Sequence, residues 1–291
     1  MKVCPGCNSE LLNDSSCGCC GFTAKMIDGF LAFAPGLATD NDNFDATAHA
    51  RLFQQESNCF WFPERNKLII WAMNKYFSNT ESLLEIGCGT GYVLNGLSSA
   101  FPEKKYTGAD IFTSGLKFAA SRVPQANFIQ MDARHIPFNN EFDVVGAFDM
   151  IEHVEEDEQV LSQMYKAVRH GGGIIATVPQ HKWLWSAVDD YGFHKRRYTR
   201  AMFGEKITKS GFEVVKITSF MSFLLPIIVL RRGRYLFYSK ETIEETTKEE
   251  IKINPVLNYL FSLICMVETR MIKAGVPFPA GGSLLCIAKK R

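Results

Sequence analysis

The sequence lacks an excess of charge of either sign. Its 291 residues include 32 Lys and Arg against 31 Asp and Glu, which gives a formal net charge of +1. Binding to a polyanion such as nucleic acid is therefore not expected from bulk charge, although one local basic patch is compatible with these totals. The chain also lacks an internal repeat.

Long apolar runs are absent as well. The two most apolar stretches, residues 220–230 and 255–267, fall short of the roughly 18 residues that a membrane span needs, and the first contains Pro226. The N-terminus is polar and rich in cysteine, unlike a signal peptide. These features predict a cytoplasmic protein, with a peripheral position at the inner face of the membrane as an extension of that prediction.

Cysteine is unevenly distributed. Five of the nine cysteines lie within the first twenty residues, in the segments CPGC and CGCC. Clustered cysteines in a cytosolic protein bind metal more often than they form disulfides, and two Cys-x-x-Cys knuckles fit a tetrahedral thiolate zinc site. We predict a structural zinc ion bound by Cys4, Cys7, Cys17 and Cys20, with Cys19 as an alternative to one of the last two.

From residue 82 onward, short apolar runs alternate with segments of helical periodicity. This alternation predicts a parallel, doubly wound α/β sheet. The expected strands are 82–87, 106–110, 127–132, 142–149, 173–179, 212–220 and 283–290. The expected helices are one or two within 45–77, followed by 92–101, 114–122, 156–169 and 200–210.

These patterns divide the chain into four parts. Residues 1–30 form a zinc-ribbon-like module, and residues 40–80 form N-terminal helices that pack on the core. Residues 81–220 and 281–291 form the core itself, which we expect to be Rossmann-like. Residues 221–280 form an apolar, mostly helical insertion before the last strand.

The segment LLEIGCGTGYVL carries the clearest chemical signal. It reads as a strand containing Glu85, then a turn with Gly87, Gly89 and Gly91, then the start of a helix. Glycine allows the backbone to turn sharply and to approach a ligand closely. The third glycine comes one residue too early for the G-x-G-x-x-G turn of dinucleotide enzymes, so a nicotinamide oxidoreductase is the less favoured alternative.

Acidic residues end or follow three further strands, at Asp110, Asp132 and Asp149. A carboxylate at the end of the second strand is suited to accept two hydrogen bonds from a ribose diol. Glycines occur at the strand–helix turns of many doubly wound folds, whereas four acids at successive strands are far more specific. At these residues the chain resembles the class I S-adenosylmethionine-dependent methyltransferases of type 11 or 12, over residues 82–220 and the last strand.

The resemblance implies a seven-stranded sheet whose last strand is antiparallel, and S-adenosylmethionine as cofactor. Asp110 would bind the ribose hydroxyls, Asp132 the adenine amino group, and Asp149 would lie beside the methyl donor. The N-terminal knuckles resemble the zinc ribbon that precedes some methyltransferase domains. In addition, Arg65 is a candidate partner for the cofactor carboxylate. The full set of expected cofactor-binding residues is Glu85, Gly87, Gly89, Gly91, Asp110, Ile111, Asp132, Ala133, Asp149 and Arg65.

Two histidines are candidate catalytic residues. His153 follows the fourth strand, near the expected position of the methyl group, and His194 lies in the loop after the fifth strand. A neutral imidazole in such a place can take a proton from a hydroxyl nucleophile. Two alternatives to a catalytic role stay open. His153 either packs structurally or contacts the cofactor, or Glu152 and His153 together hold a divalent cation.

The loop at residues 179–199 combines aromatic and basic side chains. In an open α/β sheet, ligands bind at the carboxyl ends of the strands, so this loop is expected to overhang the active site. Arginine binds phosphate or carboxylate through paired hydrogen bonds, and aromatic rings bind flat or alkyl groups. The alternative is a solvated loop before a helix capped by Thr199. The predicted substrate-binding residues are Trp183, Trp185, Arg196, Arg197 and Tyr198.

The leading hypothesis is methyl transfer to an oxygen, less favourably a carbon, of a small, apolar or lipid-linked and anionic metabolite. The cation-flanked apolar segments of the insertion suit a lid over an apolar substrate, contact with an anionic membrane, or dimerisation. Two alternatives remain, an RNA or protein methyltransferase that uses the zinc ribbon for recognition, and a cofactor-binding subunit without turnover. Nucleic acid is not favoured, because Lys2 is the only cation before Lys25. The oligomeric state stays open.

Overall fold

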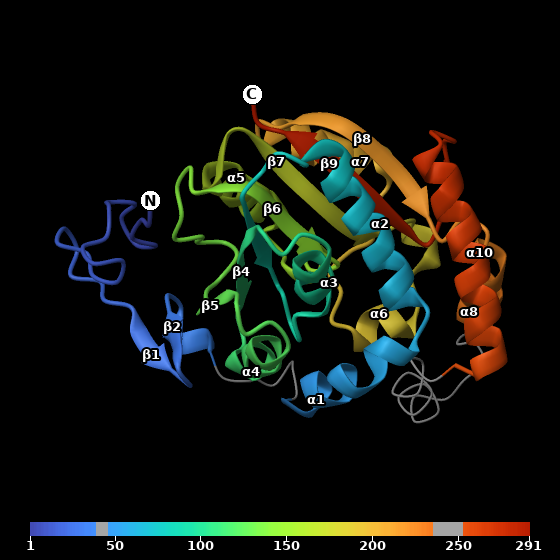
Figure 1. Ribbon diagram of the computed structural model, residues 1–291, viewed down its shortest axis with the longest axis horizontal. Coiled ribbons are helices and arrows are strands. Elements are labelled where there is room, and N and C mark those ends of the chain that lie inside the picture. Colours follow the sequence, from blue (N-terminus) through green and yellow to red (C-terminus); the bar gives the residue numbers. More distant parts are fainter. Residues whose placement is uncertain (39–45, 235–252) are drawn as a thin grey trace.

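The computed structural model describes residues 1–38, 46–234 and 253–291 (Figure 1). The polar stretch from Lys240 to Lys252 in the insertion lies outside the described residues. So does the beginning of the segment 40–80.

A nine-stranded sheet forms the centre of the described structure. Its strand order is β1-β2-β5-β4-β3-β6-β7-β9-β8. The strands β5, β4, β3, β6 and β7 are parallel, whereas β9 is antiparallel to both β7 and β8. The Rossmann-like class and the antiparallel last strand are therefore confirmed, but the strand number is nine and not seven. The bounds are β1 Lys25–Ile27, β2 Phe30–Ala32, β3 Ser82–Ile86, β4 Lys105–Asp110, β5 Asn127–Gln130, β6 Phe142–Phe148, β7 Val168–Pro179, β8 Glu213–Phe220 and β9 Ser283–Lys289.

The two additional strands form a hairpin at one edge of the sheet. Asp28 and Gly29 both have positive φ, 51° and 86°, as a two-residue hairpin turn of this handedness requires. β2 then pairs in parallel with β5, with Leu31 opposite Ile129. The N-terminal segment is thus joined to the core by backbone hydrogen bonds.

Helices cover both faces of the sheet (Figure 1). Neighbouring residues of a strand point to opposite faces: Leu84 packs in the cluster that includes α5 and α7, whereas Leu83 packs in the cluster that includes α2, α3 and α10. α4 packs beside β4 and β5, and α1 contacts α4. The bounds are α1 Ala46–Gln55, α2 Trp61–Tyr76, α3 Tyr92–Ala100, α4 Thr113–Arg122, α5 Asp157–Ala167, α6 Ala187–Tyr191, α7 Arg200–Lys209, α8 Leu225–Arg234 and α10 Pro255–Lys273.

The helix α10 is longer than its apolar run suggested. Its 19 residues are long and apolar enough to cross a membrane by length and composition, so the expectation that no segment reaches that size is wrong for this helix. One side of α10 nevertheless packs on the domain. Phe261 contacts Phe60 edge-on, the Ser262 hydroxyl donates to Glu64 at 2.6 Å, and Ile272 is buried. α10 therefore lies along the surface of the protein in this structure.

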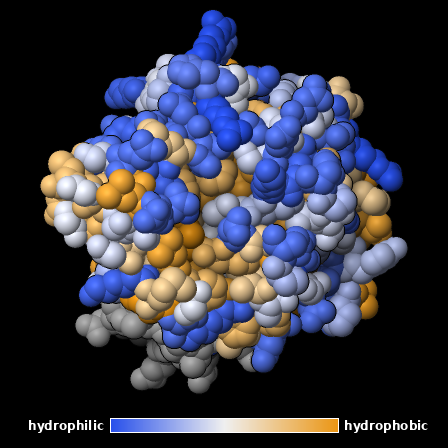
Figure 2. Space-filling model, turned by 60° about the vertical axis from the view of Figure 1, so that its left-hand side comes forward, coloured by the Kyte–Doolittle hydropathy of each residue, from blue (hydrophilic) through white to orange (hydrophobic). Residues whose placement is uncertain are grey.

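A cavity of about 520 Å³ lies at the amino ends of the parallel strands. It is lined by strand starts such as Ser82 and Lys105 and by the N-terminal residues Met1 and Lys2. Figure 2 brings the side of the N-terminal module forward and shows apolar side chains in a hollowed centre, below a hydrophilic upper part. This cavity is at the opposite edge of the sheet from the glycine turn, so it is separate from the site described next.

Candidate active site

The carboxyl ends of β3, β4, β5, β6 and β7 meet at one edge of the sheet, because these strands are parallel. The glycine turn lies at this edge and is fastened to the end of β4. The Gly89 amide donates to Asp110 Oδ2 at 2.8 Å, and the Phe112 amide donates to Asp110 Oδ1 at 3.0 Å. Each carboxylate oxygen retains a second lone pair, which a ribose diol can use.

The three glycines of the turn have positive φ but different surroundings. A Cβ on Gly89 would meet no atom within 4 Å, so this position faces open space where a ligand can approach the backbone. A Cβ on Gly91 would lie 2.9 Å from the Cα of Ala119, and one on Gly87 would overlap Met150. Gly89 thus fits a cofactor contact, whereas Gly91 and Gly87 are required by packing.

Glu85 and Arg65 place unpaired polar atoms beside the glycine turn. Oε2 of Glu85 and Nε of Arg65 are buried and have no hydrogen-bond partner within the described residues. Burial raises the pKa of Glu85 to about 8, opposed by the nearby Arg65 guanidinium. A buried carboxyl and a buried guanidinium fit the ammonium and carboxylate groups of a bound amino acid, such as the methionine part of S-adenosylmethionine.

Asp149 and Asp132 are both ion-paired. Arg65 Nη1 lies 2.5 Å from Asp149 Oδ2, which also accepts from the Thr177 hydroxyl at 2.8 Å. Asp149 has a φ of 54°, in the left-handed region. Asp132 pairs with Arg134, whose Nε lies 3.1 and 3.0 Å from the two carboxylate oxygens. Arg65, predicted to bind the cofactor, is thus in the site and bonded to another predicted cofactor residue.

His153 and His194 are neighbours in space. Their rings are nearly perpendicular, with centroids 4.8 Å apart. Nδ1 of His194 lies 2.9 Å from Asp189 Oδ1. Desolvation, followed by the neighbouring His194, lowers the pKa of His153 to about 4, although part of its side chain remains exposed. The fully buried Glu152 lies beside them. The structure thus brings the two predicted catalytic residues together beside Asp149, at the carboxyl end of β6.

Three of the five predicted substrate-binding residues hold the loop instead of facing a substrate. Arg197 is buried and binds three main-chain carbonyls and Asp189. Tyr198 is fully buried and its hydroxyl donates to Asp157 at 2.8 Å. Arg196 bonds the carbonyls of Val154 and Glu155. The predicted role of these three residues in substrate binding is therefore corrected. Their hydrogen-bond donors point to other groups of the protein and hold the loop in place.

The two tryptophans do face outward. Trp183 is 60% exposed and Trp185 is 39% exposed, with the Trp185 indole donating to Asp190 at 3.0 Å. Trp183 also packs against His181, with ring centroids 5.1 Å apart. These residues stay candidates for contact with an acceptor.

Asp189 is a residue whose role the sequence reasoning missed. It is fully buried and accepts hydrogen bonds from His194, Arg197 and Arg232 of α8. Burial would raise the pKa of Asp189, but the hydrogen bond from His194 and the charges of Arg232 and Arg197 outweigh it and lower that pKa. Its signal was available in the sequence, since Ser186 and Asp189 form the S-x-x-D capping box of α6.

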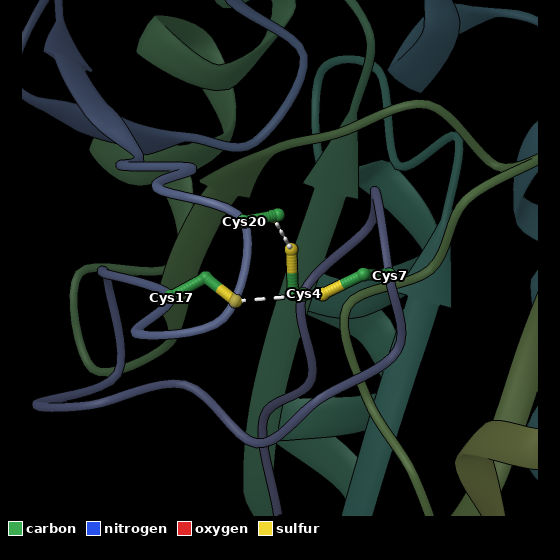
Figure 3. A group of neighbouring side chains, drawn as sticks. All are labelled: Cys4, Cys7, Cys17 and Cys20. Carbon is green, nitrogen blue, oxygen red and sulfur yellow. Dashed lines mark hydrogen bonds between the residues drawn. The ribbon is translucent and has the colours of Figure 1, made fainter.

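The four predicted zinc ligands converge in the N-terminal segment (Figure 3). Their sulfur atoms lie within 4.8 Å of one another, and two pairs, Cys4–Cys20 and Cys7–Cys17, are 3.5 Å apart. Tetrahedral thiolates around zinc lie roughly 3.8 Å apart for Zn–S bonds of about 2.3 Å. These four thiols can hold a zinc ion, while Cys19 is exposed and outside the group.

Comparison with known proteins agrees with the glycine turn and the sheet. Residues 84–176 match the family model of the methyltransferase domain. A probable S-adenosylmethionine-dependent methyltransferase of Mycolicibacterium smegmatis is 24% identical over 158 residues, which cover 53% of this chain and 60% of that relative. The phthiotriol/phenolphthiotriol dimycocerosates methyltransferase of Mycobacterium leprae is 32% identical over 93 residues, 31% of this chain and 34% of that relative.

Solved structures show the same fold. One of them is phosphoethanolamine N-methyltransferase 2 of Haemonchus contortus in complex with S-adenosylmethionine, with a TM-score of 0.57 and 19% sequence identity. The superposed part covers 87% of this chain and 59% of the Haemonchus chain. Residues 84–176 are therefore similar to a methyltransferase domain, and the sheet has the fold of a solved methyltransferase. The chain spans about one third to three fifths of the length of these two relatives. The molecule that accepts the methyl group therefore has to be inferred from the residues of this chain.

Proposed function

We propose that this protein transfers the methyl group of S-adenosylmethionine to an oxygen of a small, apolar or lipid-linked metabolite. The observation that carries the proposal is that the cofactor residues and the two histidines meet at one sheet edge. Arg65 binds Asp149 beside the glycine turn, and Glu152 and His153 follow Asp149 in the 3-10 helix at Ile151–His153.

The predicted cofactor-binding residues divide among the parts of S-adenosylmethionine in this proposal. Glu85 and Arg65 are proposed to bind the methionine part, Asp110 the ribose, and Asp132 with the Ala133 amide the adenine. When bound, the cofactor supplies an electrophilic methyl group on a sulfonium sulfur. The protein contributes mainly orientation, because methyl transfer requires the acceptor atom, the methyl carbon and the sulfur to be in line.

The acceptor side of the site favours an oxygen nucleophile. His153 and His194 lie beside Asp149, the residue that we assign to the neighbourhood of the methyl donor, and an imidazole lone pair can accept the proton of a hydroxyl group. One of these imidazoles would take the proton that the hydroxyl oxygen loses, while the bound cofactor would supply the methyl group and its sulfur would keep the electron pair of the C–S bond.

Exposed apolar side chains on α8 and α10 support an apolar or lipid-linked acceptor and peripheral contact with a membrane. Leu230 is 73% exposed and Val256 is 75% exposed. α8 is bound to the active-site loop, because Arg232 donates to the Leu184 carbonyl at 2.6 Å. A Mycobacterium leprae relative is named for methylation of phthiotriol dimycocerosates, which agrees with a lipid-related acceptor. The further exposed apolar residues of these two helices are Ile227, Val229, Leu257, Tyr259, Leu260 and Val267, and Phe223 lies just before α8.

The test is transfer of label from methyl-labelled S-adenosylmethionine to a fractionated cell lysate. We expect label in the organic fraction. Label confined to RNA or protein would replace the proposal with a macromolecular acceptor, and label confined to small water-soluble products would exclude the lipid-linked one. Tight cofactor binding with no label in any fraction would indicate a subunit without turnover.

Asp110→Ala should weaken cofactor binding at least about 10-fold, because hydrogen bonds to a charged group contribute about 1.5–3 kcal/mol each and 1.4 kcal/mol is a factor of ten. The matched control is Asp14→Ala, whose exposed carboxylate pairs with Lys2 in the N-terminal segment. Equal affinity of both variants for the cofactor, measured by calorimetry on folded protein, would contradict the assignment of Asp110.

A further inference from the structure

Glu152, His153 and His194 form a second cluster of metal-binding side chains. Each offers one ligand atom, and the three atoms lie within 4.8 Å of one another. The cluster lies at the carboxyl edge of the sheet, next to Asp149, and is far along the chain from the four cysteines. A main-chain hydrogen bond of 2.8 Å from the Lys195 amide to the Glu152 carbonyl joins the two segments that supply it.

The side-chain oxygens of Glu152 lack a hydrogen-bond partner in the part of the chain that the structure describes. The side chain itself is fully buried. The two arginines whose charges influence Glu152 are engaged with other acids, since Arg65 binds Asp149 at 2.5 Å and Arg197 binds Asp189 at 2.6 Å. A buried polar side chain whose two oxygens both lack a hydrogen-bond partner fits a ligand from outside the polypeptide.

His194 is oriented in the way that a metal-bound histidine usually is. Its Nδ1 lies 2.9 Å from Asp189 Oδ1, so the proton is on Nδ1 and the lone pair is on Nε2. A histidine that binds a metal almost always donates its other ring N–H to a carboxylate or carbonyl group. Asp189 is itself fixed by Arg197 and Arg232, so the imidazole is held in place before any ligand arrives.

We propose that Glu152, His153 and His194 bind a divalent first-row transition metal ion. Two imidazoles and one carboxylate suit zinc or iron, and three protein ligands leave coordination positions open. Ligand atoms around such an ion are roughly 3.3 Å apart for bonds of about 2.0–2.1 Å, so modest side-chain rotation closes the cluster.

The open positions define the class of acceptor, a point that rests on the proposed methyl transfer. They would take a hydroxyl or carboxylate oxygen of the acceptor beside Asp149. A divalent ion lowers the pKa of a bound hydroxyl strongly, so the acceptor oxygen would be anionic at neutral pH and its proton would pass to solvent. In the metal-bound protein, His153 is then a ligand and the ion takes over the activation of the oxygen.

The metal content of the purified full chain tests the site without any assay of activity. After chelation, re-equilibration with Zn²⁺ and desalting, we expect two zinc ions per chain. The Cys7→Ser/Cys17→Ser variant should retain one zinc ion, bound at the second cluster. The triple variant that also carries Glu152→Gln should retain none. Glu152→Gln alone should weaken the second site by more than the roughly 10- to 100-fold that loss of an outer-shell partner costs. His135→Gln, an exposed histidine outside the cluster, is the control and should keep two.

Titration with Co²⁺ on the unmodified chain covers the case in which the cysteine variant does not fold. The equivalent of Co²⁺ bound by the four cysteines should show thiolate charge-transfer absorption. The equivalent bound by Glu152, His153 and His194 should show ligand-field absorption without a thiolate band. A single equivalent, with thiolate absorption only, would overturn the metal site. These outcomes separate the metal site from the methyl transfer. A second metal ion without methyl transfer refutes the transfer alone. A single zinc ion in the unmodified chain, with transfer intact, refutes the metal site alone.

Discussion

The Asp189→Asn substitution tests the buried ion network beneath the active-site loop. The carboxylate accepts hydrogen bonds from His194, Arg197 and Arg232. Asparagine has nearly the same shape but no charge, so Arg197, which is 3% exposed, loses its counter-ion. Removing one partner of a buried ion pair costs about 3–5 kcal/mol.

The expected loss is large enough to measure as a change in melting temperature. At about 2 °C per kcal/mol for a chain of this size, 3–5 kcal/mol corresponds to a decrease of roughly 6–10 °C. Thermal unfolding followed by circular dichroism, in excess chelator so that metal binding does not contribute, measures this decrease.

The neighbouring residue provides a matched control. Asp190 is exposed and bonds the Trp185 indole, so Asp190→Asn should change stability by no more than about 0.5 kcal/mol. Limited proteolysis within 182–195 should be faster for Asp189→Asn and unchanged for Asp190→Asn. Melting temperatures of the two variants within about 1 °C of each other would refute the assignment of Asp189 as the centre of this network.

Three further predictions follow from other parts of the molecule. Because burial raises the pKa of Glu85 to about 8, the protonated carboxyl favours the folded, cofactor-free state at lower pH, and this contribution is lost as the pH rises through 8. A cationic cofactor favours the carboxylate, so its affinity should rise up to about pH 8 and then level off, and Glu85→Gln should abolish this rise in calorimetry. Chelation should increase protease cleavage within residues 1–25 before cofactor binding is lost, and unchanged cleavage would exclude a structural zinc. The double variant Val256→Ser/Leu260→Ser should bind anionic lipid vesicles more weakly in a flotation assay at unchanged cofactor affinity, and equal flotation would exclude this surface.

The sequence predicted most of the core strands within a few residues because their signals are local, whereas β7 begins at Val168, five residues before the expected start. Each is a short apolar run bounded by glycine, proline or acidic residues, as around Glu85 and Asp110. The hairpin β1–β2 was missed because each strand has three residues and its stability comes from pairing with β5, which is about a hundred residues away. The Asp28–Gly29 pair was the local signal that indicated it.

The same distinction explains the site predictions. Asp110 and Asp149 lie at strand ends as predicted, because motif position fixes them there. The directions of Arg197 and Tyr198 were mistaken because composition does not tell whether a donor points to solvent or to a main-chain carbonyl. Those carbonyls belong to segments as distant as Gly282, so the contacts exist only after the sheet has formed.

Asp189 links the apolar surface to the chemistry. Arg232 comes from α8, which carries exposed apolar side chains, and His194 belongs to the candidate metal cluster, yet both bind the same carboxylate. Since the interior around Asp189 is fully buried, a displacement of α8 is transmitted to His194 through two short polar contacts. The proposed apolar acceptor, if it lies along α8, would therefore meet the imidazole in the orientation that α8 imposes. An acceptor that reached the site from the N-terminal cysteine module, at the opposite edge of the sheet, would not use this connection.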